Sequence, residues 1–185
     1  NNLIKAEEYI KKILKINNNH YDALRDYGYI KYLNNKTVEA EKIYEKILNR
    51  IQKDIFALNV YGLINYDNQS VEKAIKYFLK AINLDPKYTD SYNNLGKIYF
   101  DIEQIDKAFD SFKKAYKINK NSSKTLINIG NVLSLKDKNK YSILAYKKAL
   151  NFSKEKGNIL SNISLVYSRM KDFENTKKYY DEAIK

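Results

Sequence analysis

Apolar residues recur three or four places apart along the chain, with polar and charged residues between them. Leu95, Ile98 and Ile102 follow this spacing, and so do Ala108 and Phe112 in the segment after them. The spacing places apolar side chains on one face of an α-helix, which turns once every ~3.6 residues. The same pattern along the rest of the chain predicts an all-α fold of about eleven helices and no strands.

Glycine adds a longer period. Gly28, Gly62, Gly96 and Gly130 stand 34 residues apart. A glycine inside a helix costs roughly 1 kcal/mol relative to alanine, so glycines in step need a structural reason. A constant period of this length is typical of stacked helical hairpins, in which each repeat buries its apolar face against its neighbours. We expect the missing side chain to let the paired helix approach closely.

Numbering each repeat from the residue seven places before its glycine divides the chain without any insertion. Full repeats span residues 21–54, 55–88, 89–122 and 123–156. A shortened repeat spans 157–185, and residues 1–20 match the second helix of a preceding repeat. Asp54, Asn121 and Asp172 lie near the expected turns and are candidate helix caps.

Position 20 of this numbering is small in every repeat, and position 24 is always aromatic. The aromatic residues at position 24 are Tyr44, Phe78, Phe112, Tyr146 and Tyr180. We expect these rings to fill the space that the glycines and small residues leave between the two helices of a hairpin.

One repeat reads Tyr92-Asn93-Asn94-Leu95-Gly96-Lys97-Ile98-Tyr99 and continues with Ala108, Phe112 and Ala115, and the repeat before it ends in Leu84-Asp85-Pro86. These segments resemble the tetratricopeptide repeat (TPR) family, and the resemblance covers the whole chain. It implies a right-handed α-solenoid of stacked antiparallel helix pairs, a TPR superhelix, forming a single domain over residues 1–185. Lys31 and Asn65 stand where the family usually has a large aromatic residue, and Ser164 replaces the fifth glycine.

In this family the first helices of successive repeats line a concave groove. The resemblance therefore implies a non-catalytic scaffold for protein–protein interaction, which holds a peptide or partner segment of unknown identity. The expected groove residues are Arg25, Tyr29, Tyr32, Asn59, Leu63, Tyr66, Asn93, Asn94, Lys97, Phe100, Lys124, Asn128, Asn131 and Asn162.

Two rows stand out within this groove set. Tyr32, Tyr66 and Phe100 form an aromatic row, which offers a large contact area at low entropic cost. One asparagine per repeat from Asn94 to Asn162 forms an amide row that can pair with a peptide main chain. Each row has a second interpretation: the rings pack against the next repeat, and the asparagines reflect a family preference and an asparagine-rich composition. Too few residues match the carboxylate clamp of chaperone-binding TPR domains for us to expect tight binding of chaperone tails.

The chain carries 34 lysines and arginines against 22 acidic residues, a net charge of +12. The first-helix positions that face the expected groove are balanced in charge, with four basic residues, Arg25, Lys97, Lys124 and Arg169, and four acidic ones, Asp22, Asp67, Asp90 and Asp101. The surplus lies on second helices and turns, as in Lys113, Lys114 and Lys117. We therefore favour a protein partner over nucleic acid. The alternative is binding of RNA or an anionic surface through a lysine-rich convex face, because lysines that neutralise phosphates drive such binding.

The sequence indicates no catalytic site. It has no cysteine and one histidine, His20, so no ligand set for a transition metal is visible. The glycines lie one per repeat and form no phosphate-binding loop. We expect no enzyme activity, no cofactor and no metal site. A further alternative is that the repeats form the targeting or regulatory arm of an enzyme whose catalytic domain lies outside this segment.

No apolar run approaches the ~20 residues that a membrane-spanning helix requires, and no signal peptide is visible. The absence of cysteine is compatible with a cytoplasmic location. The chain begins and ends in mid-repeat, which we interpret as a fragment of a longer protein. Both terminal helices should then expose apolar faces, through which self-association is expected.

Overall fold

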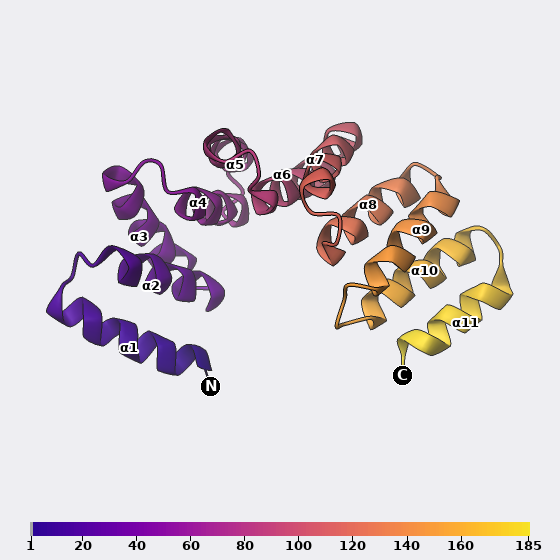
Figure 1. The fold of residues 1–185 in the computed structure, drawn as a ribbon, viewed down its shortest axis with the longest axis horizontal. Coiled ribbons are helices and arrows are strands. Elements are labelled where there is room, and N and C mark those ends of the chain that lie inside the picture. Colours follow the sequence, from indigo (N-terminus) through magenta and orange to yellow (C-terminus); the bar gives the residue numbers. More distant parts are fainter. Residues whose placement is uncertain (1) are drawn as a thin grey trace. The chain divides into compact units, whose positions relative to one another are not determined.

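The computed structural model describes residues 2–185, which form eleven helices and no strands (Figure 1), as predicted. The first helices of the repeats are all 13 residues long: α2 (Tyr21–Leu33), α4 (Ile55–Asp67), α6 (Thr89–Asp101), α8 (Ser123–Leu135) and α10 (Gly157–Arg169). The other helices are α1 (Asn2–Ile16), α3 (Thr37–Arg50), α5 (Val71–Leu84), α7 (Ile105–Ile118), α9 (Asn139–Leu150) and α11 (Phe173–Ala183).

Side-chain caps start several of these helices. The carboxylate of Asp54 accepts a hydrogen bond from the backbone N–H of Ala57, and Asp172 caps α11 in the same way. The prediction for Asn121 was wrong, because Ser122 is the residue that caps α8. His20 caps α2 through its Nδ1 atom, a role that the sequence analysis missed.

A residue with a positive φ angle follows the first helix of every hairpin. The φ angles at Asn35, Gln69, Glu103, Asp137 and Lys171 lie between 53° and 60°. Only glycine adopts this conformation without steric cost, and asparagine and aspartate tolerate it better than residues with long side chains. Three of the five turns therefore carry local backbone strain at a long side chain.

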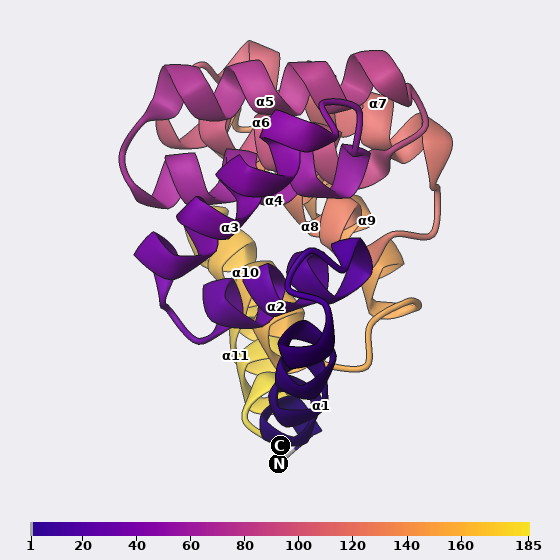
Figure 2. The ribbon, with the colours of Figure 1, turned by 90° about the vertical axis from the view of Figure 1, so that its left-hand side faces the viewer.

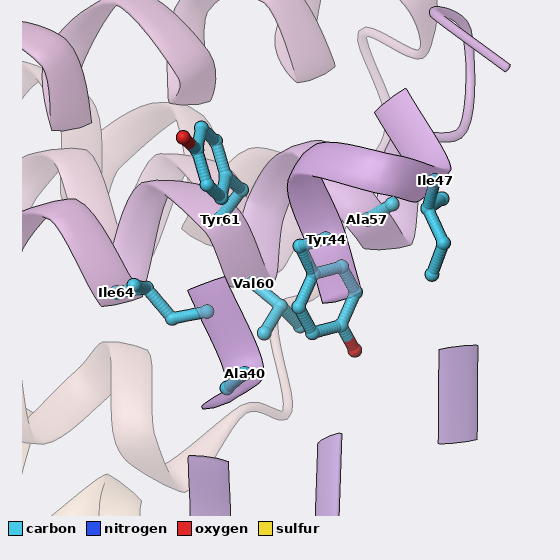
Figure 3. Close-up of a cluster of buried hydrophobic side chains, with 7 residues drawn as sticks. All are labelled: Ala40, Tyr44, Ile47, Ala57, Val60, Tyr61 and Ile64. Atoms are coloured by element: carbon cyan, nitrogen blue, oxygen red, sulfur yellow. The ribbon is translucent and has the colours of Figure 1, made fainter. Parts of the chain in front are cut away.

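The chain divides into two compact units, and the boundary falls in the first turn of α6: unit 1 ends at Ser91 and unit 2 runs from Tyr92 to Lys185. In unit 1, α2 lies between α1 and α3, and α4 packs against α3 and α5 (Figure 2). Residues of α3 and α4 form a buried cluster in which the Tyr44 ring lies beside Val60 (Figure 3). In unit 2, α7 to α11 pack each against the next along the chain.

The repeat glycines make the close approach that the sequence predicted. A Cβ atom placed on Gly96 or Gly130 would lie 2.5 Å from the ring of Phe112 or Tyr146. Both rings are 2 % exposed and therefore have little freedom to move aside. The last hairpin differs: Tyr180 at position 24 is 57 % exposed, so the expectation that it fills the space between helices was wrong.

Lys31 is a buried cation in unit 1. Its side chain is 5 % exposed, and its Nζ lies 3.0 Å from a carboxylate oxygen of Glu39 and 3.3 Å from one of Glu7. The hydrogen bond to Glu39 raises the pKa of Lys31 well above its ordinary value. Lys31 therefore links α1, α2 and α3 at a repeat position that is held in unit 2 by Tyr99, Leu133 and Tyr167.

Candidate functional site

Two adjoining hollows lie on the first helices of unit 2. One, of about 170 Å³, is lined by Lys97, Phe100, Asp101, Phe112, Asn128 and Asn131. The other, of about 150 Å³, is lined by Phe100, Asn131, Ser134, Leu135, Tyr146, Asn162, Leu165, Val166 and Arg169. Phe100 and Asn131 line both hollows, so the two hollows adjoin at these residues. We call the two hollows together the unit 2 groove.

Five of the expected groove residues meet in this place: Lys97, Phe100, Asn128, Asn131 and Asn162. The structure adds Phe112 and Tyr146 from second helices, which the sequence analysis treated only as core residues. Phe112 and Tyr146 face Gly96 and Gly130 on the first helices. This pairing could have indicated that the two rings lie beneath the surface that the first helices form.

Asn131 is held in one orientation at the junction of the two hollows. The Tyr146 hydroxyl donates a hydrogen bond of 2.6 Å to Asn131 Oδ1. Burial raises the pKa of Tyr146, so its hydroxyl remains a donor at neutral pH. With its oxygen occupied in this way, Asn131 offers its amide N–H groups to a ligand.

Apolar and cationic groups flank Asn131 in the second hollow. Leu135 is 51 % exposed and Leu165 is 53 % exposed, which is high for leucine. Arg169 donates a hydrogen bond of 3.0 Å to the Ser134 hydroxyl, which orients its guanidinium group. The groove thus combines amide donors, apolar contact area and a positioned cation.

Asn59 and Asn93 do not contribute to an open surface. Asn59 is 5 % exposed and accepts a hydrogen bond of 3.0 Å from the Ser91 hydroxyl in the next repeat. Asn93 is 2 % exposed and accepts an equivalent bond of 3.0 Å from Thr125. Both expected groove residues are therefore buried links between successive repeats.

An apolar contact replaces this link further along the chain. Position 5 of the next repeat is Ile127, which packs against the buried cluster that contains Ile159.

The expected groove residues of α2 are engaged with neighbouring side chains. Tyr32 donates a hydrogen bond of 2.8 Å to Asp67 on α4, and the Tyr29 ring contacts Phe56 edge-on at 5.3 Å between centroids. Arg25 pairs with the carboxylate of Asp26 at 3.3 Å. For this pair of helices, the alternative that the rings pack against the next repeat describes the structure.

The remaining expected residues are not part of the unit 2 groove. Leu63 and Tyr66 are half-buried on α4, Asn94 is 8 % exposed on α6, and Lys124 is exposed at the start of α8. None of the four lines either hollow.

Within residues 2–185, no group of three or more histidine, cysteine or acidic residues is arranged to hold a metal ion. Across the same residues, no helix combines the length and the apolar character needed to cross a membrane.

The fold defines the chain as a helical repeat protein built from successive helix pairs. A TPR repeat model matches residues 62–102, and a tetratricopeptide repeat model matches residues 89–122 and 158–185. The chain therefore contains tetratricopeptide repeats, a type of repeat that generally mediates protein–protein interaction and is typically non-catalytic.

Solved TPR structures share the fold. PilF of Pseudomonas aeruginosa has a TM-score of 0.81 and 19 % identity, with 96 % of this chain and 81 % of that chain covered. MamA has a TM-score of 0.73 and 22 % identity, with 85 % and 92 % covered. YrrB, described as a TPR protein with an unusual peptide-binding site, has a TM-score of 0.69 and 17 % identity, with 96 % and 92 % covered. A sequence search among curated proteins found no significant match.

Proposed function

We propose that the protein is a non-catalytic scaffold that holds an extended segment of a partner protein in the unit 2 groove. The observation that carries this proposal is the oriented amide of Asn131 at the junction of the two hollows. An extended segment presents main-chain carbonyl groups along its length, and these accept hydrogen bonds from side-chain amides. Asn128 and Asn162 stand on either side of Asn131 as further amides.

The apolar residues of the groove would hold side chains of the same segment. Phe100 contributes to both hollows, and Leu165 adds exposed apolar surface to the second. Lys97 and Arg169 are opposed by Asp101 at the lining, so charge alone does not select the ligand. The favoured ligand is therefore an extended segment with apolar side chains and an accessible main chain.

Peptides selected on the protein by phage display would test this proposal, with affinities measured by calorimetry. We expect Phe100→Ala and Leu165→Ala each to weaken binding about tenfold, because each removes apolar contact in the groove. Leu144→Ala is the matched control, since Leu144 is 62 % exposed on α9 and lines neither hollow. Selected peptides that bind both groove variants as tightly as the original protein would contradict the proposal.

A second candidate is binding of RNA or an anionic surface through the second helices. The observation that favours it is the exposure of Lys113, Lys114 and Lys117 on α7 in a chain of net charge +12. Such binding should weaken steeply as salt is added, whereas recognition in the groove, whose lining has two cations and one carboxylate, should weaken much less.

A role as the targeting arm of an enzyme and a cytoplasmic location also stay predictions.

Self-association through terminal helices is a further prediction with structural support. Ile16 on α1 is 90 % exposed and Phe173 on α11 is 73 % exposed, so both helices present apolar surface to solvent.

A further inference from the structure

Unit 1 has a larger hollow, which none of the expected groove residues lines. It measures about 410 Å³, within the range of about 300–1,000 Å³ that is usual for ligand pockets. It is formed by the end of α3, the loop after it, the start of α4 and the second half of α5, and is lined by Leu48, Asn49, Gln52, Lys53, Leu58, Tyr77, Lys80, Asn83 and Leu84. We call it the α3–α5 hollow.

The lining of the α3–α5 hollow has cations but no carboxylate. Lys53 and Lys80 are exposed, and neither forms an ion pair with an acidic residue of the described chain. Lys80 Nζ lies 5.2 Å from the centre of the Tyr77 ring, which holds the ammonium group near the apolar part of the lining. Asn49, Gln52 and Asn83 add three amide side chains.

The equivalent place in unit 2 is bridged by side chains of the chain itself. Tyr116 stands at the position of Leu48 and Lys148 at the position of Lys80, in both cases two repeats later. Lys148 Nζ donates a hydrogen bond of 2.7 Å to the Tyr116 hydroxyl. Leu48 has no hydroxyl to offer, so Lys80 lacks this partner and the space between α3 and α5 stays open.

We propose that the α3–α5 hollow binds an acidic segment of a partner protein, with an aliphatic side chain on Leu48 and Leu58 and a carboxylate at Lys53 and Lys80. Charge complementarity selects this ligand, because the hollow has cations without counter-charges. An inorganic anion would need the lysines alone and would leave the leucine floor unused. The site is separate from the unit 2 groove, so either proposal can fail without the other.

The test uses the whole chain and a short peptide of alternating glutamate and leucine, with a glutamine–leucine peptide as its uncharged counterpart. Binding is followed by NMR through the backbone amides of Asn49, Gln52 and Asn83. We expect saturable shifts at these amides with the acidic peptide and at least about tenfold weaker binding of its uncharged counterpart.

Two variants locate the site. Leu48→Tyr should fill the hollow and give Lys80 the partner that Lys148 has, and so weaken binding of the acidic peptide about tenfold. The double variant Lys53→Ser with Lys80→Ser should weaken it by a similar factor. Its matched control is Lys117→Ser with Lys120→Ser, which removes the same charge from exposed lysines of unit 2.

Circular dichroism would verify that each variant retains its helix content. Several results would overturn the proposal: no saturable shift at millimolar peptide, equal binding of the uncharged peptide, or unchanged affinity in Leu48→Tyr. Equal loss in the lysine control, or competition by single-stranded RNA or inorganic phosphate at the same amides with higher affinity, would also overturn it.

Discussion

The two units share one repeat pattern but use the surface of their first helices differently. In unit 1, Tyr32 bonds to Asp67, the Tyr29 ring contacts Phe56, and these groups satisfy one another. In unit 2, the corresponding surface has hollows in which Asn131 presents amide donors and Leu165 is half-exposed. The repeat period thus decides where helices lie, whereas substitutions at a few facing positions decide whether the surface is closed or open.

Position 11 of the repeat gives the largest contrast between the units. Lys31 occupies it in unit 1 and is buried against Glu7 and Glu39. Lys31→Met should lower the free energy of unfolding by about 2 kcal/mol, because it leaves carboxylates without the cation they face; the exposure of Glu39 keeps the loss below that of a fully buried pair. Urea unfolding at neutral pH measures this.

Lys113→Met is the matched control in unit 2, since Lys113 is half-exposed and its Nζ lies 3.9 Å from Asp110. This change should stay within about 0.5 kcal/mol. A similar loss in both variants would show that burial of Lys31 has no special effect on stability.

The Lys31 cluster also predicts a pH dependence. Hydrogen bonds to Lys11 and Lys31 lower the pKa of Glu7, and the bond to Lys31 lowers the pKa of Glu39, both from an ordinary value of 4.5. Their stabilising effect is therefore present above pH 4.5 and is lost as the pH falls through the lowered pKa values. The effect of Lys31, whose pKa is raised from 10.5, is complete below that pH and is lost only in strong alkali. The stability difference between the original protein and Lys31→Met should therefore shrink as the pH falls below 4.5.

The repeat glycines provide a second contrast. Gly130→Ala should destabilise the protein by roughly 1–2 kcal/mol, since overpacking against the buried Tyr146 ring outweighs the gain in helix propensity. Gly28→Ala should be less destabilising. Its added Cβ would lie 2.9 Å from Cγ2 of Ile43 and 3.0 Å from the Tyr44 ring, whereas the Cβ at Gly130 would lie 2.5 Å from the Tyr146 ring, so the neighbours of Gly28 need to shift less. Thermal unfolding of both variants makes the comparison, and equal destabilisation would contradict it.

The turns give the smallest expected difference. Glu103→Gly should stabilise unit 2 by roughly 0.5–1 kcal/mol, because it removes the steric cost of a positive φ angle while adding some entropy to the unfolded chain. Asn35→Gly should gain less, since asparagine already tolerates this conformation. Chemical unfolding of the two variants measures this difference, and a larger gain at Asn35 would be against the explanation.

The residues at which the first helices begin could be predicted from the sequence. First helices begin at Tyr21, Ile55, Thr89, Ser123 and Gly157, which are the residues at which the repeats were predicted to begin. This accuracy has a physical cause, because the glycine and the aromatic residue at position 24 must meet across each hairpin. Only the last pair, Ser164 and Tyr180, departs from this rule. Ser164 instead donates a hydrogen bond to the Thr176 carbonyl.

The open surfaces were harder to predict, since each depends on a pair of residues in different repeats. Asn59 and Asn131 both belong to the expected groove, yet one is buried by its bond to Ser91 and the other lines both hollows. A serine or threonine at position 3 of the following repeat could have indicated that the asparagine at position 5 is buried. The α3–α5 hollow likewise depends on Leu48, at a repeat position that Tyr116 occupies in unit 2. The effect of this difference can be interpreted only when the lysine that faces each position is known.

The buried bonds of Asn59 and Asn93 also restrict how such a chain can change length in evolution. Loss of residues 89–122 would bring Asn59 opposite Thr125, and the amide would still meet a hydroxyl. Loss of residues 123–156 would bring Asn93 opposite Ile159, and the amide would face a hydrocarbon side chain. Two deletions of equal length are therefore not equivalent, and the repeats of this chain cannot be exchanged freely despite their common period.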